Sequence, residues 1–292
     1  MPWASAQGRQ QTRIITMYEA IYRVKRHVPS RAWRALTGPY WWWYNRARHQ
    51  LAGLLSTRLR QSGARLATYR DRHRGQRCFI LGNGPSLRAT DLGRLRDEVT
   101  FGMNRIYLHF PEMGYATTYY LAINTLVIQQ CAEDILRLRM PRFVTWRSRR
   151  WLRADPDVIF LDTDYTGPEV FTTDLAGRVF EGSTVTFVAL ELAYYMGFQE
   201  AVLLGVDHSF STQGPPNITV ESQGDDLDHF SPSYFGKGFR WQLPDLEGSE
   251  RAYRLAREAF EKDGRRVVDA TLGGKLTVFP KVEFESLFRD GE

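Results

Sequence analysis

A short glycine turn carries the clearest chemical signal in this chain of 292 residues. The turn Gly82-Asn83-Gly84-Pro85-Ser86 follows the apolar run 78–81, and a helical pattern begins at Leu87. Two glycines between a buried strand and a helix let the backbone approach a bound group closely. Their free N–H groups at the positive end of the helix suit a phosphate or another anion. Asn83 and Ser86 add side-chain hydrogen bonds, so we expect a ligand cradle rather than an ordinary tight turn.

The turn differs from two well-known phosphate-binding motifs. It is not a P-loop, because no lysine followed by serine or threonine comes after its second glycine. It is not a full dinucleotide fingerprint, because Leu87 stands where the third glycine belongs. The turn therefore predicts nucleotide binding of a less common kind.

Polar residues at other predicted strand ends extend this cradle. Ligands of open α/β sheets bind at the carboxyl ends of the strands. Asn104 and Asn124 each follow an apolar strand candidate, and an amide can both donate to and accept from a nucleobase, ribose or phosphate. The resulting nucleotide site comprises eleven predicted residues: Gly82, Asn83, Gly84, Pro85, Ser86, Asn104, Asn124, Gly182, Ser183, Thr184 and Asp207.

The elements that must position these residues alternate along the chain. Apolar strand candidates lie at 78–81, 99–103, 117–122, 142–146, 157–161 and 201–206, and helical patterns lie at about 125–138, 184–196 and 249–263. The alternation predicts an α/β fold, Rossmann-like, with a largely parallel sheet and helices on both faces. In the last helix Ser249 is the expected N-cap and Gly264 the expected stop.

One long segment, residues 207–245, breaks the alternation. It is rich in Gly, Pro, Asp and Ser and has no clear periodicity. A loop of this length in a compact domain is usually a binding loop or a lid over an active site. We therefore predict a lid region.

Charge divides the chain into two parts. Residues 1–77 carry 16 Lys and Arg against 2 Asp and Glu, whereas the remainder carries 23 against 31. The asymmetry predicts a basic, aromatic-rich helical extension at 1–76 and a nucleotide-binding catalytic domain at 77–292. Cys78 and Cys131 lie in apolar settings without metal-ligand spacing, so we expect reduced core residues.

The predicted extension has the composition of an interfacial segment. Trp33 and the run 40–44, which contains three consecutive tryptophans, stand among several arginines. No stretch reaches the roughly 18 uncharged apolar residues that span a bilayer, and no signal-peptide pattern is present. Aromatic rings flanked by cations indicate an anionic membrane surface as partner, and hence a cytoplasmic protein, peripheral at the inner face of the cytoplasmic membrane. Nucleic-acid binding, which we do not expect, and packing within the domain or a homo-oligomer interface are the alternatives.

Several motifs taken together resemble one group of proteins. They are Ile80–Leu87, Asn104, Asn124, Gly182-Ser183-Thr184 with Ala193–Phe198, Leu203–Asp207, Asp228-His229-Phe230, Tyr234-Phe235-Gly236, Trp241–Leu246 and Thr271–Leu276. From about residue 77 to 288 the pattern resembles the DUF115 or motility-associated-factor-like glycosyltransferases. That group is related to the bacterial CMP-sialic-acid-dependent sialyltransferases and to the 6-hydroxymethylpterin diphosphokinase family.

The resemblance implies a nucleotide-sugar-dependent, sialyltransferase-like glycosyltransferase. A CMP-linked acidic sugar is the favoured donor, and a glycan or glycolipid is the implied acceptor. In the sialyltransferases a histidine in the lid acts as base and two tyrosines help to hold the donor phosphate. His229 and Tyr234 match the histidine and one tyrosine, while His208, Ser209 and Phe210 stand where the second tyrosine would be expected.

The chemistry of sugar transfer also points to a histidine. The acceptor hydroxyl must lose its proton as the new bond forms, and a neutral imidazole with a pKa of ~6.5 removes it well at neutral pH. Of the six histidines, His208 and His229 lie on the strand-end and lid side. We expect His229 to be the base, with structural hydrogen bonding as its alternative role and His208 as the weaker candidate.

Metal dependence would separate the donor classes. Asp162-Thr163-Asp164 and the cluster Asp225-Asp226-Leu227-Asp228-His229 offer ligands that suit Mg²⁺ or Mn²⁺. A CMP-sugar leaves as a monophosphate and requires no cofactor, so no metal residue is assigned, whereas a nucleotide diphosphate sugar would call for Mg²⁺ or Mn²⁺. An ATP-dependent pterin-type diphosphokinase and a non-catalytic nucleotide-binding scaffold are the alternative functions.

Overall fold

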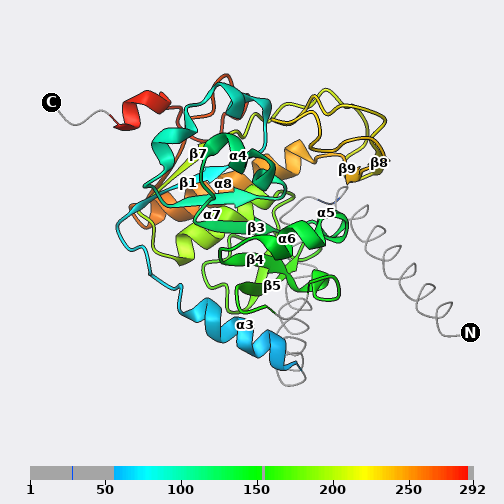
Figure 1. The fold of residues 1–292 in the computed structure, drawn as a ribbon. Coiled ribbons are helices and arrows are strands. Elements are labelled where there is room, and N and C mark those ends of the chain that lie inside the picture. The colour runs from blue at the N-terminus through cyan, green and yellow to red at the C-terminus, as the bar shows by residue number, and fades with distance from the viewer. Residues whose placement is uncertain (1–27, 29–55, 153–154, 289–292) are drawn as a thin grey trace, which may run out of the picture.

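The described chain is built on an eight-stranded parallel sheet. The computed structural model describes Val28, residues 56–152 and residues 155–288. Its sheet has the order β10-β7-β1-β2-β3-β4-β5-β6, with every pairing parallel (Figure 1). The strands are β1 (Arg77–Leu81), β2 (Thr100–Met103), β3 (Tyr119–Ala122), β4 (Arg142–Thr145), β5 (Val158–Asp164), β6 (Arg178–Phe180), β7 (Glu200–Leu204) and β10 (Arg266–Asp269).

The predicted fold class is therefore confirmed. All six predicted strands are present, as β1 to β5 and β7. The two edge strands, β6 and β10, were not predicted, because runs of three and four residues are too short to establish a period of two.

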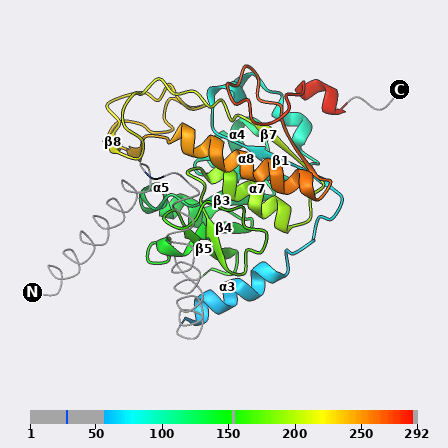
Figure 2. The same ribbon diagram turned by 180° about the vertical axis from the view of Figure 1, so that it is seen from behind.

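Strand β1 is apolar on both faces, because helices cover both sides of the sheet. Cys78 and Ile80 point into one core, with residues of α7 (Val185–Tyr195) and α8 (Leu246–Lys262). Phe79 and Leu81 point into the other, with residues of α5 (Thr125–Gln130) and α6 (Ala132–Arg137). Figure 2 shows α7 and α8 from the side opposite the view of Figure 1. Both cysteines are buried and free, as predicted.

The strand order reverses at β1. The chain passes outward from β1 to β6, returns through α7 and adds β7 and β10 on the other side of β1. Ligands of open α/β sheets bind at such a reversal, outside the carboxyl ends of the strands. The Gly82 turn, Asn104 and Asp207 follow β1, β2 and β7, so the topology brings these predicted site residues to one edge.

The described part of the basic segment belongs to the packed domain. Helix α3 (Thr57–Ala67) contacts β5 and buries Leu59 and Leu66. Its Ser62 Oγ accepts a hydrogen bond from the Phe160 N–H at 3.1 Å. The boundary predicted between residues 76 and 77 therefore does not coincide with a break in packing. The predicted aromatic anchor at 33–44 lies outside the described residues.

The helices differ from the prediction at three points. A five-residue 3-10 helix, Pro85–Ala89, replaces the α-helix expected after the glycine turn. The helix expected at 125–138 is divided into α5 and α6 at Cys131. Helix α8 begins about one turn before the predicted start, because its N-cap is Asp245 and not Ser249. Asp245 Oδ1 accepts from the Gly248 N–H at 2.9 Å. Gly264, with φ +67°, ends α8 as predicted.

Shorter elements complete the described fold. The remaining α-helix is α4 (Phe110–Met113), and further 3-10 helices span Leu92–Leu95, Ile106–His109, Trp146–Ser148 and Phe284–Phe288. None of the helices within the described ranges has the length and apolarity of a membrane-spanning segment.

The predicted lid region contains one small antiparallel hairpin. Strands β8 (Thr219–Glu221) and β9 (Arg240–Gln242) pair within it. The lid buries five apolar side chains in the core on the α5 side: Phe230, Tyr234, Phe235, Trp241 and Leu243. This burial explains how a segment with little regular structure is held against the sheet.

Helix α7 also buries a carboxyl group. The Glu191 side chain is 0% exposed, and its Oε1 accepts from the Thr172 N–H at 2.6 Å. Its Oε2 has no partner among the described residues. Burial raises the pKa of Glu191 well above its usual value, and the hydrogen bonds from Thr172 offset this only in part. The fold therefore favours the protonated form.

This burial predicts a pH-dependent stability. An unfolded Glu ionises near pH ~4.3, so the stability contribution of Glu191 is fully present below that pH and is lost as pH rises through the higher folded pKa. Glu191→Gln keeps the acceptor for Thr172 and cannot ionise. We expect it to raise the free energy of unfolding by about 1–3 kcal/mol near pH ~8 and by little near pH ~4, measured by urea denaturation. A difference of the same size at both pH values would contradict this account.

Candidate functional site

The glycine turn is closed by the neighbouring strand. The Gly82 N–H donates to the Leu204 carbonyl at 2.7 Å, and the Gly84 N–H donates to the Gly205 carbonyl at 2.9 Å. A Cβ on Gly82 would lie 2.2 Å from the Gly205 oxygen, so glycine is required where the ends of β1 and β7 meet. The prediction that these N–H groups are free for a ligand is wrong, because the pairing of β1 with β7 continues into the turn.

An anion already occupies the turn, and it belongs to the protein. Asp207 Oδ1 accepts from the Ser86 N–H at 3.1 Å, and its Oδ2 accepts from Ser86 Oγ at 2.7 Å. A Cβ on Gly84 would lie 1.8 Å from Asp207 Oδ2. The second glycine therefore makes room for this carboxylate, and a phosphate entering the turn would meet a like charge.

Asn83 and Asn104 retain hydrogen-bonding capacity that the protein does not use. Asn83 Nδ2 donates to the Met103 carbonyl at 3.1 Å, which places the side chain at the end of β2. The Oδ1 atoms of both Asn83 and Asn104 are buried without a partner among the described residues. A buried acceptor without a partner is unfavourable by about 1–3 kcal/mol, and a ligand N–H or O–H would satisfy it. Of the predicted set, these two side chains are best suited to a nucleotide.

Asn124 is instead a helix cap. Its Oδ1 accepts from the N–H groups of Leu126 at 2.9 Å and Val127 at 3.3 Å, at the start of α5. Its Nδ2 donates to Gln242 Oε1 of the lid at 3.3 Å. Asn124 therefore supports α5 and holds β9, and its carbonyl oxygen is already used.

The remaining predicted donor-pocket residues gather at the start of α8. Thr184 caps α7 by accepting from the Thr186 N–H at 3.3 Å, and Ser183 Oγ would lie 2.6 Å from a Cβ on Gly248. Gly182 and Ser183 both have positive φ, +57° and +63°. His208 Nε2 lies 3.2 Å from Glu250 Oε1, and only 8% of its side chain is exposed. His208 follows Asp207, so this group adjoins the glycine turn.

The lid is docked over the ends of β1 and β2. The Phe230 N–H donates to the Asn83 carbonyl at 2.9 Å. Arg88 donates to two lid carbonyls, that of Phe230 at 2.5 Å and that of His229 at 3.3 Å. The backbone N–H of Arg105 donates to the Tyr234 hydroxyl at 3.3 Å. These contacts join the lid on either side of His229 to the backbone at Asn83 and next to Asn104.

His229 is oriented by a buried carboxylate. Its Nδ1 lies 2.8 Å from Asp226 Oδ2, and Asp226 also accepts from the N–H groups of Asp228 and Phe235. A carboxylate can only accept, so Nδ1 carries the proton and Nε2 is the basic nitrogen. The imidazole is stacked on Tyr234, with ring centroids 4.0 Å apart and planes at 7°. The described residues give its Nε2 no hydrogen bond.

Asp226 was not assigned to the site from the sequence. The acidic cluster at 225–229 was considered as a metal site, whereas Asp226 is a hydrogen-bond partner of His229. The three-residue spacing from Asp226 to His229 was the available signal, but it does not distinguish the two roles without the turn geometry.

Tyr234 was predicted to contact the donor phosphate, but its side chain is not exposed to a ligand. Its side chain is 0% exposed, and its hydroxyl accepts the Arg105 N–H. Burial raises the pKa of Tyr234, so the neutral phenol is favoured. Tyr234 therefore acts as the packing surface that holds the ring of His229.

The two acidic motifs are occupied by the protein itself. Asp164 accepts from the Thr166 and Gly167 N–H groups and pairs with Arg178 at 3.4 Å. Asp228 accepts from Ser211 and Thr212; burial alone would raise its pKa, but these hydrogen bonds outweigh burial and lower it. Within the described ranges no group of three His, Cys, Asp or Glu side chains could hold a metal ion.

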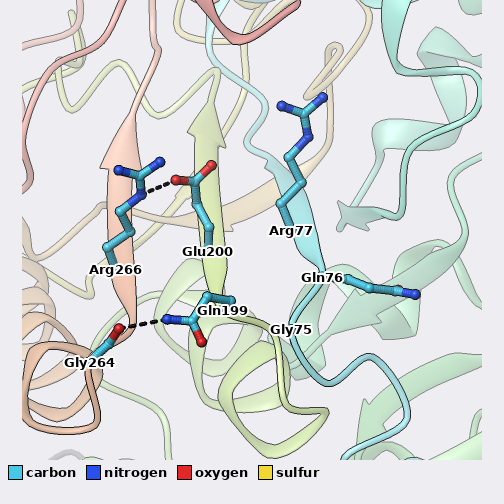
Figure 3. A pocket seen from close by; sticks show the side chains of 7 residues that line it. All are labelled: Gly75, Gln76, Arg77, Gln199, Glu200, Gly264 and Arg266. Atoms are coloured by element: carbon cyan, nitrogen blue, oxygen red, sulfur yellow. Dashed lines mark hydrogen bonds and ion pairs between the residues drawn. The ribbon is translucent and has the colours of Figure 1, made fainter. Parts of the chain in front are cut away.

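A pocket of about 450 Å³ lies at the opposite edge of the sheet (Figure 3). It is lined at the amino ends of β1, β7 and β10 by Gly75, Gln76, Arg77, Gln199, Glu200, Gly264 and Arg266. Figure 3 shows Arg266 paired with Glu200 and Gln199 bonded to the Gly264 carbonyl. Because these groups satisfy one another and the pocket lies at the amino end, it does not belong to the predicted site.

Comparison with known proteins identifies a remote structural similarity. No family model matches the chain, and no curated protein matches it. Among solved structures, the chain is similar to the structure of MAf glycosyltransferase from Magnetospirillum magneticum AMB-1, with 14% identity and a TM-score of 0.46. The match covers 80% of this chain and 39% of that chain, so this chain spans well under half the length of that protein.

Proposed function

We propose that the protein is a glycosyltransferase in which His229 removes the acceptor proton. The observation that carries this proposal is the Asp226–His229 pair on a lid docked over Asn83 and Asn104. The arrangement unites an oriented base with buried acceptors for a nucleotide. The proposed donor is a nucleotide-activated sugar, with a CMP-linked acidic sugar favoured, and the proposed acceptor is a hydroxyl of a glycan or glycolipid.

The reaction follows from the orientation of the imidazole. Nε2 takes the proton of the acceptor hydroxyl as that oxygen bonds to the anomeric carbon of the sugar. The bond from this carbon to the phosphate oxygen breaks, and the nucleotide leaves with the bonding electrons. Asp226 accepts from Nδ1–H throughout and stabilises the imidazolium that forms.

Donor binding is assigned to the two unused acceptors. The Oδ1 atoms of Asn83 and Asn104 would accept from a nucleobase amino group or from ribose hydroxyls. Asp207 fills the glycine turn, so the donor phosphate would bind away from it. Attachment to an anionic membrane through residues 1–76 remains part of the proposal, as does a peripheral cytoplasmic location.

Replacing His229 should remove chemistry and spare binding. We expect His229→Ala to lower kcat by about 10²–10⁴-fold, because general-base catalysis is lost, with nearly unchanged nucleotide affinity. Asp226→Asn should lower kcat by about 10–10³-fold, because the amide can donate to Nδ1 and favour the wrong tautomer.

Asp225→Asn is the matched control for Asp226→Asn. It removes the same charge from an exposed neighbour of Asp226 and should leave kcat within about twofold of wild type. Sugar transfer at the wild-type rate in His229→Ala would remove this residue from the reaction. Equal losses in the two aspartate variants would show that Asp226 acts through net charge alone.

The asparagines should determine nucleotide affinity. We expect Asn83→Ala to weaken binding by about 1–3 kcal/mol, measured by calorimetry, because a ligand donor loses its acceptor. Asn104 has φ +51°, so Asn104→Gly removes the side chain without backbone strain and should have a similar effect. Wild-type affinity in both variants would place the nucleotide elsewhere.

The donor class can be read from ligand-induced stabilisation. We expect CMP to raise the melting temperature without Mg²⁺, because ligand binding stabilises the fold by about 2.7 kcal/mol at a hundredfold excess over Kd. UDP, GDP, CDP and ATP, each with and without Mg²⁺, are the comparisons in a thermal-shift assay. Stabilisation by ATP and Mg²⁺ alone would favour the diphosphokinase alternative. A response to CMP without sugar-transfer activity would favour the non-catalytic scaffold.

A further inference from the structure

The loop that follows β10 has no role in the site described so far. It consists of Thr271-Leu272-Gly273-Gly274-Lys275, which we call the β10 loop, and it belongs to one of the motifs found in the sequence. Strand β10 is an edge strand that pairs in parallel with β7. The β10 loop therefore lies at the carboxyl edge of the sheet, beside the segment that follows β7.

Both ends of the β10 loop are bonded to that segment. Thr271 Oγ1 accepts from the Val206 N–H at 3.2 Å, and the Lys275 N–H donates to the Asp207 carbonyl at 2.8 Å. The carboxylate of Asp207 is bonded to Ser86 of the glycine turn. Asp207 therefore joins the turn through its side chain and the β10 loop through its backbone.

The conformation of the β10 loop is fixed by the protein. The Gly274 N–H donates to the Thr271 carbonyl at 3.3 Å, which makes Leu272 and Gly273 the central residues of a tight turn, and Gly273 has φ +66°. A Cβ on Gly274 would lie 2.9 Å from Thr271 Cγ2. Lys281 Nζ donates to the Gly274 carbonyl at 3.2 Å. A ligand would therefore meet a loop that is already ordered.

Three hydrogen-bond donors of the β10 loop are unused. Within the described part of the chain, nothing accepts a hydrogen bond from the N–H groups of Leu272 and Gly273 or from Lys275 Nζ, and all three residues are exposed. Residues 270–282 contain two lysines and no Asp or Glu. Successive N–H groups in a turn with a left-handed glycine bind anions, and lysine binds phosphate as a point charge.

We propose that the β10 loop binds the phosphate of the donor nucleotide. The proposal rests on the proposed function and adds the phosphate position, which must differ from the glycine turn because Asp207 fills that turn. Strands β10 and β1 are separated by β7 alone, so their ends lie about 10 Å apart, two strand spacings. That separation is close to the length of a nucleoside monophosphate, which can thus extend from Asn83 to the β10 loop.

The lid is attached to the same segment after β7. Asp228 accepts from the Ser211 N–H at 2.5 Å, and the ring of Phe210 lies 6.2 Å from that of His229. On the other side of His229, Phe230 is bonded to Asn83. A phosphate held on the β7 side of Asn83 therefore stays near the lid segment that carries the proposed base.

Comparing CMP with cytidine tests the charge of Lys275. Calorimetry on the full chain measures both ligands, which differ only in the phosphate. We expect Lys275→Ala to weaken CMP binding by about tenfold, because one charge-assisted hydrogen bond is lost, and to leave cytidine binding within about twofold of wild type. Lys262→Ala is the matched control, because it removes an exposed lysine at the far end of α8.

Leu272→Pro tests the backbone of the β10 loop without changing its charge. It removes an N–H that the described residues do not use, and proline is favoured at the first central position of a turn when φ is negative, as it is at Leu272. We expect CMP binding to weaken by about threefold to tenfold, with cytidine binding unchanged. Leu272→Ala is its control, because it shortens the same exposed side chain and keeps the N–H.

The outcomes separate this inference from the proposed function. Wild-type CMP affinity in Lys275→Ala and Leu272→Pro, or equal losses for CMP and cytidine, would overturn the phosphate assignment and leave the proposed function standing. Failure of the wild-type chain to bind any nucleotide would overturn both. Binding of inorganic phosphate without any nucleotide would also overturn the donor assignment, since the β10 loop would then hold a free anion. Equal melting temperatures of all variants establish that folding is not the cause.

Discussion

The contact between Asp207 and the glycine turn constrains the rest of the site. Three elements meet there: the end of β1, the end of β7 and the carboxylate that bridges them through Ser86. Any side chain at Gly82 or Gly84 would collide with this junction. The glycines are therefore explained by packing between parallel strands, and the position expected for a phosphate is held by the protein's own charge.

Closing the turn changes which residues can recognise a ligand. The backbone N–H groups of the turn are used, whereas the side-chain oxygens of Asn83 and Asn104 are not. A ligand bound by side chains at this edge would therefore meet acceptors, which suit N–H and O–H donors better than phosphate oxygens. The lid then supplies His229, which combines an orienting carboxylate with a ring nitrogen that the described residues leave without a hydrogen bond.

More of the fold than of the candidate site could be predicted from the sequence. Strands such as β1 and β7 are buried on both faces, so continuous apolar runs identified them, while β6 and β10 were too short to detect. The strand-end positions of Asn83, Asn104 and Asp207 also followed from the pattern. Their hydrogen bonds did not, because the Asp207–Ser86 contact joins residues 121 positions apart. The role of Asp226 likewise required the fold of the lid.

The docked lid has a kinetic consequence for any ligand of this site. The Oδ1 atoms of Asn83 and Asn104 are buried in the structure in which Phe230, Arg88 and Arg105 hold the lid in place. If the lid must open before a ligand reaches these atoms, the measured dissociation constant equals the intrinsic one divided by the open fraction. Substitutions at Arg88, far from any bond that is made or broken, would then change association rates by changing that fraction alone. Entry to the site would be gated by the same three contacts that give the lid its shape.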